Sequence, residues 1–249
     1  MSAKRFVILA APRTGSNLLC SLLNSHPQIL CHHEVFNPRG IFYALDRRDG
    51  SMALATRDER DRQPFEFLDR LWKASDDARY VGFKMTSGQH EGIMQQMLSD
   101  SSVQKIVLHR ANRVRTYVSQ LIAEQTDQWE VYDEAELVRD VPRLRIDVKA
   151  LRAHAESNAS FYSNLEATLR SSRQSWLEVL YQDLLSRRTH ARLLSFLGAT
   201  PAALAARSVQ QNRIDLRVLV DNFEELAAAL EETDYHSELH ELREIVHDR

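Results

Sequence analysis

Five short apolar segments, separated by stretches with helical spacing, constrain the fold of this chain more than any other feature. They are rich in Val, Ile, Leu and Phe, which suits buried strands. The segments cover residues 6–10, 29–31, 80–85, 105–109 and 176–181. Apolar strands that alternate with helices are typical of a parallel sheet covered on both faces. The sequence therefore predicts an α/β fold with a central, mostly parallel sheet flanked by helices.

The stretches between these segments carry apolar side chains three and four residues apart, as on one helix face. Helices are expected after Ser16, over 65–72, over 91–99, after Asn112, up to Gly198, after Pro201 and over 223–230. No repeat or linker divides the 249 residues. We therefore expect a single domain over 1–249, in which 130–249 is largely helical.

The charge balance and the cysteine content exclude several classes of protein. The formal net charge is −3, so the chain lacks the basic field that holds nucleic acid. Two cysteines cannot build a disulfide framework or a four-thiolate metal site. The apolar run over 6–11 is shorter than a signal-peptide core, and no run is long enough to cross a membrane. We expect a cytoplasmic protein without a transmembrane segment or a nucleic-acid partner.

Residues 45–63 are dense in charged side chains. Such a run is typical of an exposed loop or a solvated helix face, and that is the interpretation we favour. A lid over a substrate is the alternative, and the sequence does not choose between the two.

The turn after the first predicted strand has the composition of an anion site. Its sequence is Ala11-Pro12-Arg13-Thr14-Gly15-Ser16-Asn17-Leu18. Gly15 permits a tight turn, Ser16 suits the N-cap of the next helix, and the N–H groups there would point at one spot. The hydroxyls of Thr14 and Ser16 add donors, and Arg13 adds a planar fork suited to phosphate or sulfonate. The fold is therefore expected to be a P-loop-like three-layer sandwich.

This turn differs from the loop of nucleotide triphosphatases, which reads G-x-x-x-x-G-K-[ST]. The first glycine is missing, and Ser16 rather than lysine follows Gly15. No predicted strand ends in an acidic residue that would hold Mg²⁺, and the fourth segment runs into His109-Arg110. We infer that the ligand is a nucleotide bound without Mg²⁺. A P-loop kinase or nucleotidase, or a non-catalytic nucleotide-binding protein, stays as the alternative.

A second motif follows the fourth segment. Arg110 comes at the strand end, and Ser119 lies nine residues later, about two turns into the next helix. Their side chains can converge on a second phosphate group.

Together, these motifs resemble the two nucleotide signatures of the sulfotransferase superfamily. The signatures match 12–17 and the stretch from Leu108 through Arg110 to Ser119. Residues 179–184 resemble the Tyr-Glu-Asp-Leu segment of that family, with Gln182 in place of the glutamate. Residues 117–129 and 222–226 look like the bacterial carbohydrate and glycolipid branch, which includes the trehalose and nodulation-factor types.

The resemblance implies an enzyme that moves the sulfuryl group of 3′-phosphoadenylyl sulfate (PAPS) to a hydroxyl of a carbohydrate, glycolipid or related small molecule, without a metal. The products would be PAP and a sulfate ester. It places the 5′-phosphosulfate on the first loop and the 3′-phosphate on Arg110 and Ser119, and it places Tyr181 beside the adenine. The implied loop residues are Arg13, Thr14, Gly15, Ser16, Asn17 and Leu18. A homodimer is common in this branch.

Sulfuryl transfer needs a base for the acceptor hydroxyl and cations around the sulfonate and the leaving phosphate. Arg13 can supply positive charge, and Lys84 can stabilise the bridging oxygen. The resemblance to the trehalose-type branch places the catalytic glutamate at Glu34. We expect burial near Val35 and Phe36 to raise the pKa of Glu34. His90 is the alternative base.

Cys31, His32 and His33 suggest a metal site, but successive side chains on an extended segment point to opposite faces. We therefore expect no metal. The acceptor pocket should come from 37–80 and 130–165. The aromatic side chains there can either contact the acceptor or belong to the core; they are Tyr43, Phe65, Trp72, Trp129 and Tyr132.

Overall fold

The computed structural model describes residues 3–50, 52–209, 211 and 214–241. Its strands are β1 (Lys4–Ala10), β2 (Ile29–His32), β3 (Tyr80–Thr86), β4 (Val103–His109) and β5 (Trp176–Leu180). Its α-helices are α1 (Ser16–Asn24), α2 (Arg57–Arg62), α3 (Pro64–Lys73), α4 (Glu91–Ser99), α5 (Arg113–Thr126), α6 (Val148–Ser171), α7 (Arg187–Leu197), α8 (Leu216–Leu219), α9 (Phe223–Leu230) and α10 (Tyr235–Leu239). Short 3₁₀ turns, η1 (Leu45–Arg47), η2 (Glu134–Glu136) and η3 (Tyr181–Asp183), complete the set.

The five strands form one sheet in the order β2-β3-β1-β4-β5, and every pair in it is parallel. Each of the five apolar segments is a strand, as predicted. At the carboxyl end of β1, Ala10 is paired with Thr86 of β3 on one side and with Leu108 of β4 on the other. The loop that follows β1 therefore lies between the loops that follow β3 and β4, where open α/β sheets bind ligands.

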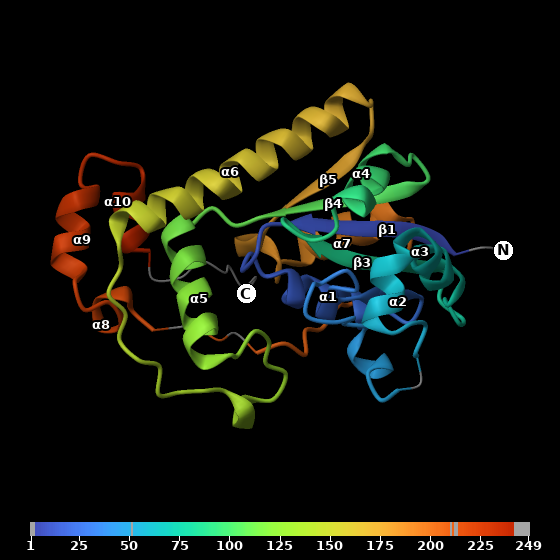
Figure 1. Ribbon diagram of the computed structural model, residues 1–249, viewed down its shortest axis with the longest axis horizontal. Coiled ribbons are helices and arrows are strands. Elements are labelled where there is room, and N and C mark those ends of the chain that lie inside the picture. Colours follow the sequence, from blue (N-terminus) through green and yellow to red (C-terminus); the bar gives the residue numbers. More distant parts are fainter. Residues whose placement is uncertain (1–2, 51, 210, 212–213, 242–249) are drawn as a thin grey trace.

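Helices cover both faces of the sheet (Figure 1), which confirms the predicted three-layer α/β fold. Side chains of β1 alternate between the two faces, as strand geometry requires. Val7 and Leu9 pack with α3, α4 and α6, whereas Phe6 and Ile8 pack with α1 and α7. A third apolar cluster joins α5 and the start of α6 to α8, α9 and α10.

The segment after Pro201 is not a helix, so that prediction is wrong: the described residues 201–209 have no regular secondary structure. Their N–H groups bond to other parts of the chain instead. Arg207 N–H donates to Ser21 Oγ (2.6 Å), and Val209 N–H donates to the carbonyl of Val131 (2.8 Å). These tertiary contacts outweigh the helix propensity of an alanine-rich stretch, which tertiary context commonly overrides.

The charge-dense segment 45–63 is more than a solvated surface. Arg60 on α2 is buried, with 1% of its surface exposed. Its Nη1 donates to the carbonyls of Val35, Asn37 and Gly40, each at 2.9 Å. One arginine of this segment therefore holds the 35–40 loop, which directly follows Glu34.

Among the described helices, none combines the length and the apolar character that a bilayer crossing requires.

Candidate functional site

The loop between β1 and α1 makes the tight turn that the sequence predicts. Gly15 has φ of +88°, the left-handed region that glycine adopts without strain. It is the cap residue of α1, so the predicted N-cap at Ser16 is displaced by one residue. No side chain caps this helix among the described residues, which leaves the N–H groups of its first turn available to an anion. Thr14 closes the loop, since its hydroxyl donates to the Ala11 carbonyl (2.8 Å).

Arg13 reaches from this loop to the helix that carries the second motif. Its Nε donates to Ser119 Oγ at 3.1 Å. Its Nη1 donates to the Trp129 carbonyl and its Nη2 to Gln211 Oε1, both at 2.8 Å. The two predicted motifs are therefore in direct contact, although 106 residues separate Arg13 from Ser119.

Arg110 lies against the same loop. Its Nη1 donates to the Arg13 carbonyl (2.9 Å), and its guanidinium lies 4.5 Å from the centre of the Tyr181 ring, within cation–π range. The same ring also lies against Gly15, where an added Cβ would lie 2.4 Å from Tyr181 Cδ2. The ring therefore fits only because residue 15 is glycine.

The arginines make this part of the site strongly positive. Burial, together with the nearby charge of Arg110, lowers the pKa of Arg13 to about 10, against the opposing influence of Glu34 and Tyr181. A cation whose pKa falls in this way is stabilised by an incoming anion. The arrangement suits a phosphate or sulfonate ligand.

The ends of β1 and β4 are joined by a side chain that the sequence analysis did not single out. Tyr162 on α6 accepts a hydrogen bond from Ala11 N–H (2.9 Å), and its hydroxyl donates to the Leu108 carbonyl (2.6 Å). It thereby fixes the start of the anion loop relative to the strand that leads to Arg110.

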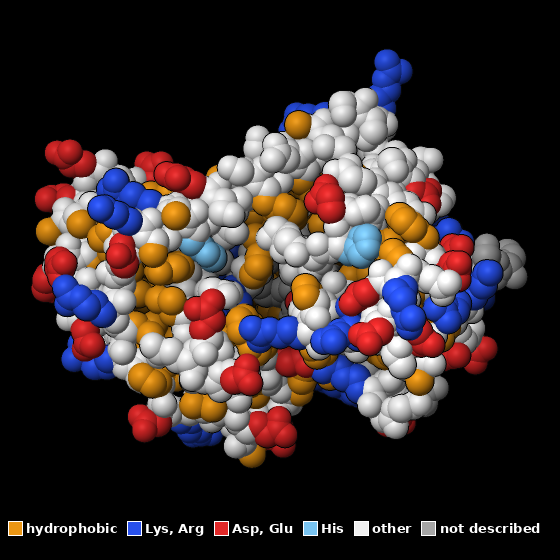
Figure 2. Space-filling model, viewed as in Figure 1, with side chains coloured by type: hydrophobic (Ala, Val, Ile, Leu, Met, Phe, Trp, Pro, Cys, Tyr) orange, Lys and Arg blue, Asp and Glu red, His pale blue; other side chains and the backbone are white. Residues whose placement is uncertain are grey.

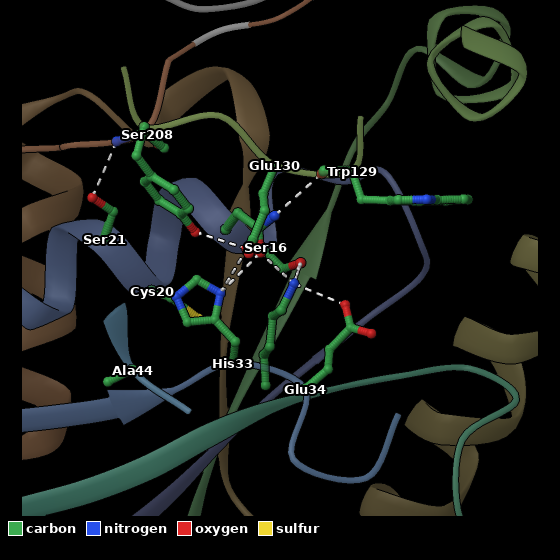
Figure 3. A network of polar contacts seen from close by, with 12 residues as sticks. Ser16, Cys20, Ser21, His33, Glu34, Ala44, Trp129, Glu130 and Ser208 are labelled. Atoms are coloured by element: carbon green, nitrogen blue, oxygen red, sulfur yellow. Dashed lines mark hydrogen bonds and ion pairs between the residues drawn. The ribbon is translucent and has the colours of Figure 1, made fainter. Parts of the chain in front are cut away.

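Lys84 and Glu34 form an ion pair on the other side of the loop (Figure 3). Lys84, on β3, places its Nζ 2.8 Å from Glu34 Oε1 and donates to Ser16 Oγ (3.3 Å) and to Asn17 Oδ1. Glu34 Oε2 accepts from the amides of Asn37 (2.6 Å) and Gln89 (2.8 Å). The ammonium thus lies between the carboxylate and the first turn of α1.

The pKa of Glu34 does not shift as expected. Burial raises it, but the charge and the hydrogen bond of Lys84, with the Asn37 amide and the charge of Arg13, outweigh burial, and the pKa is lowered from its ordinary value of 4.5. The sequence argument considered only the apolar neighbours of Glu34. The carboxyl group is therefore ionised at neutral pH, and it is a weaker base than the sequence argument expected.

The surface in front of these strand ends is hollowed. Figure 2 shows the hollow near the centre of the face, between α5 and the side that carries α2 and α3, with Lys or Arg side chains at its edge. A small pocket beside Arg13 is lined by Ile122, Ala123, Thr126, Gln128, Leu137, Val138, Val141 and Gln211. Within the described residues, no three His, Cys, Asp or Glu side chains are grouped as metal ligands.

Comparisons with known proteins agree with this geometry. No family model matches the chain. It is 27% identical over 217 residues to nodulation protein H of Rhizobium tropici, covering 85% of this chain and 82% of the relative. It is also 27% identical over 230 residues to nodulation protein H of Rhizobium meliloti (strain 1021), covering 89% of each. A crystal structure of a sulfotransferase from Alicyclobacillus acidocaldarius matches 97% of this chain and 95% of its own, with a TM-score of 0.52 and 17% identity. The fold is that of a sulfotransferase.

These results confirm the resemblance to bacterial sulfotransferases that the motifs predict. In this chain, the predicted residues form two adjoining groups around the loop after β1. The first group contains Arg13, Gly15, Arg110, Ser119 and Tyr181, and the second contains Ser16, Asn17, Glu34 and Lys84. Leu18 lies on α1 and packs against the core cluster of that sheet face, so only its backbone N–H can take part in anion binding.

His90, the alternative base, has a different place in the structure. It is the N-cap of α4, and its Nδ1 accepts a hydrogen bond from Ile93 N–H at 3.2 Å. A neutral imidazole that accepts at Nδ1 carries its proton on Nε2 and has no second lone pair for an acceptor hydroxyl. This capping role favours Glu34 over His90.

The aromatic candidates for the acceptor pocket divide into core and surface. Tyr43 and Trp72 are core residues, with 7% and 6% of their surface exposed. Phe65 is 50% exposed and lies beside the His90 ring. Trp129 and Tyr132 follow α5, and the Trp129 ring lies near the Arg13 guanidinium (5.9 Å).

Sequence analysis missed Asn37 and Gln89, the two amides on Glu34, as well as Tyr162. Asn37 had a weak signal, because it is a polar residue three positions after Glu34 and next to Pro38. Gln89 and Tyr162 had none, because their roles depend on how separate elements pack.

Proposed function

We propose that this sulfotransferase transfers the sulfuryl group of PAPS to a hydroxyl of a carbohydrate or glycolipid, giving PAP and a sulfate ester. One observation carries the proposal: Arg110 donates to the backbone carbonyl of Arg13, and the turn that brings these two arginines together also contacts a lysine–glutamate ion pair through Ser16. The first pair suits an anionic nucleotide, and the second suits the handling of a proton.

The donor nucleotide would lie on the positive side of the site. Arg110 and Ser119 would bind the 3′-phosphate, the N–H groups at the start of α1 would bind the 5′-phosphosulfate, and the adenine would lie beside Tyr181. Arg13 contacts Ser119 and precedes the loop N–H groups, so its guanidinium can serve either anionic group. These assignments rest on the family resemblance and on the proximity of the residues.

The chemistry would follow from the second group. The acceptor hydroxyl gives its proton to Glu34 as its oxygen forms a bond to sulfur. The bond from sulfur to the bridging oxygen breaks, and its electron pair stays on the 5′-phosphate. Lys84, which touches both Glu34 and the first turn of α1, can stabilise the charge that develops on that oxygen.

The residues present favour this reaction over those of a kinase or nucleotidase. The loop has no lysine after Gly15, and β4 leads into Arg110 rather than into an acidic residue. A non-catalytic nucleotide-binding protein would have no need of a half-buried, ionised Glu34 that accepts from Lys84, Asn37 and Gln89.

Calorimetry with PAP in EDTA tests the donor site. We expect PAP to bind without divalent metal and to bind more tightly than ADP, which lacks the 3′-phosphate that Arg110 and Ser119 would hold. Equal affinity for PAP and ADP, or binding that requires Mg²⁺, would contradict the proposal and favour a kinase or nucleotidase.

Transfer of labelled sulfate from PAPS to a panel of sugars, glycolipids and small alcohols tests the reaction and identifies the acceptor. We expect a labelled sulfate ester from at least one carbohydrate-containing acceptor. PAP binding without transfer to any of the panel would favour a nucleotide-binding protein. Light scattering of the purified chain tests the homodimer that the resemblance implies.

A further inference from the structure

His33, next to Glu34 in sequence, lies in the site without having a part in the chemistry proposed above. It follows β2, and 2% of its side-chain surface is exposed. Its Nδ1 lies 3.2 Å from Asn17 Oδ1 and 3.6 Å from Glu130 Oε2 (Figure 3). Its Nε2 is buried and has no hydrogen-bond partner among the described residues.

The two neighbours of Nδ1 fix the tautomer of this ring. Both are oxygen atoms that only accept hydrogen bonds, so the proton lies on Nδ1. Burial lowers the pKa of His33 well below its ordinary value, and the charges of Lys84 and Arg48 add to that effect. His33 is thus a neutral donor aimed at Asn17.

Asn17 contacts both His33 and Lys84. Its Oδ1 accepts from His33 and from Lys84 Nζ, and its Nδ2 faces the Trp129 carbonyl at 3.5 Å. The remaining partners of the ammonium are Ser16 and Glu34. Among the described residues, the three donors of Lys84 therefore have three partners, and His33 contacts one of them, Asn17.

Glu130 lies beside the same ring nitrogen, with its Oε2 3.6 Å from His33 Nδ1. Its carboxylate accepts from Tyr132 Oη (3.0 Å) and is paired with Arg48, which offsets its charge in a half-buried position. It lies one residue after Trp129, whose carbonyl binds Arg13. The segment after α5 therefore contacts both the donor side and the lysine–glutamate side of the site.

We propose that His33, oriented by Glu130, is a positioning residue for sulfuryl transfer: it fixes the Asn17 carboxamide, which aims the Lys84 ammonium at Glu34 and the anion loop. The inference rests on the proposed function, because it assigns His33 a role in that reaction. It concerns the rate of transfer and not the affinity for the donor.

The variants His33→Leu and His33→Asn separate positioning from simple packing. Leucine fills the space without a donor, whereas the Nδ2 of asparagine can take the place of the histidine Nδ1. We expect His33→Leu to lower kcat by about 100-fold, the typical effect of a small misplacement of a reacting group, with PAP affinity within about 2-fold of the wild type. His33→Asn should recover most of the loss. The matched control is His32→Leu, which removes the neighbouring buried imidazole that bonds to Ala44 N–H instead, and should leave kcat unchanged.

A second readout does not depend on turnover. In a ¹³C-detected titration of glutamate side chains, the Glu34 signal, assigned with Glu34→Gln, reports how closely Lys84 approaches it. We expect the pKa of Glu34 to be higher in His33→Leu than in the wild type and to return toward the wild-type value in His33→Asn. If the wild type transfers no sulfate, the proposed function fails while this titration still tests the contact chain. A Glu34 titration that does not rise in His33→Leu, or a kcat loss that His33→Asn does not relieve, would overturn the inference.

Should His33→Leu fail to fold, Glu130→Gln tests the same chain from its surface end. We expect a smaller kcat loss of the same kind with unchanged PAP affinity. Wild-type kcat in Glu130→Gln, together with an Nε2–H tautomer of His33 in ¹⁵N imidazole spectra of the native protein, would also overturn it.

Discussion

The two sides of the site differ in how their charged side chains are compensated. On the donor side, which comprises Arg13, Arg110 and Ser119, the hydrogen-bond partners that Arg13 has among the described residues are neutral oxygens. The pKa of Arg13 is lowered to about 10, chiefly by burial and then by Arg110. On the transfer side, Lys84 and Glu34 form an ion pair at 2.8 Å that is mostly removed from solvent. The donor side is therefore stabilised when a negative ligand binds. The Lys84–Glu34 pair is already neutral overall, and its proposed role is to accept and hold a proton.

This difference predicts that substitutions on the two sides will fail in different ways. Loss of a donor-side cation should weaken nucleotide binding and turnover together. Loss of a transfer-side group should reduce kcat and spare the affinity for PAP.

The largest effect is expected for Arg13→Ala. It removes a half-buried cation that, under the proposed function, binds the donor and stabilises the charge of the transition state, so we expect kcat/KM to fall by about 10³-fold or more and PAP binding to weaken by about 100-fold. Calorimetry and initial rates measure the two quantities. Arg57→Ala, which removes an exposed arginine of α2, is the control. Wild-type PAP affinity in Arg13→Ala would contradict the proposal that the donor side binds the nucleotide.

Glu34→Gln should affect the rate alone. Glutamine keeps the shape and the hydrogen-bonding oxygen but cannot accept a proton, so kcat should fall by about 10²- to 10³-fold, within the usual range for a general base. The affinity for PAP, measured by calorimetry, should stay within about 2-fold of wild type, because no donor contact is lost. If Glu34→Gln retains most of its activity, another group is the base.

Lys84→Met tests the cause of the low pKa of Glu34. A base works when deprotonated, so the wild-type kcat should hold until the pH falls below the ordinary glutamate value of 4.5. Without the ammonium, burial, the largest single influence on this carboxyl, raises its pKa. We expect the loss of rate to begin at a higher pH, beside an overall decrease of kcat of about 100-fold. Profiles of kcat against pH with saturating PAPS measure both, and an unmoved acid limb would show that Lys84 does not control Glu34.

Gly15→Ala should destabilise the backbone turn that carries Arg13 and contacts Tyr181. The change combines a left-handed conformation with a Cβ that would lie 2.4 Å from the Tyr181 ring. We expect unfolding free energy to fall by about 2–4 kcal/mol, and PAP binding to weaken. Gly198→Ala is a matched control, since its φ is +78° but its nearest neighbour is the flexible end of Lys4. It should lose about 1 kcal/mol. In urea denaturation, equal losses in the two variants would mean that the Tyr181 contact is unimportant.

The elements of the fold could be predicted from local pattern, and the site only in part. A strand that is buried on both faces appears in the sequence as a short apolar run, whatever surrounds it. All five strands of the sheet were therefore predicted. The sequence could predict that Arg13, Gly15, Arg110 and Tyr181 lie close together, because each follows a strand end in an ordered motif. Tyr162 was not predicted, because its partner Ala11 is 151 residues away and nothing local marks that contact.

The errors have the same origin. The helix expected after Pro201 does not form because Ser21 and Val131 bind its N–H groups, and neither is near it in sequence. Arg60 was assigned to a solvated face, yet carbonyls of the 35–40 loop bury it. The pKa of Glu34 was expected to rise because only its apolar sequence neighbours were considered. The lysine that lowers this pKa lies on β3, far from Glu34 in sequence.

The smallest effect is expected for His90→Ala, which separates the two candidates for the base. His90 caps α4 through Nδ1, so its loss should lower the free energy of unfolding by about 1 kcal/mol, a typical cap contribution. Turnover should stay within about 5-fold of the wild type, because the capped tautomer has no lone pair with which to accept the acceptor proton. His90→Asn, which preserves a capping oxygen, should regain the stability in urea denaturation. If His90→Ala abolishes transfer while Glu34→Gln does not, the proton goes to the imidazole, and the ion pair of Lys84 and Glu34 serves only to shape the site.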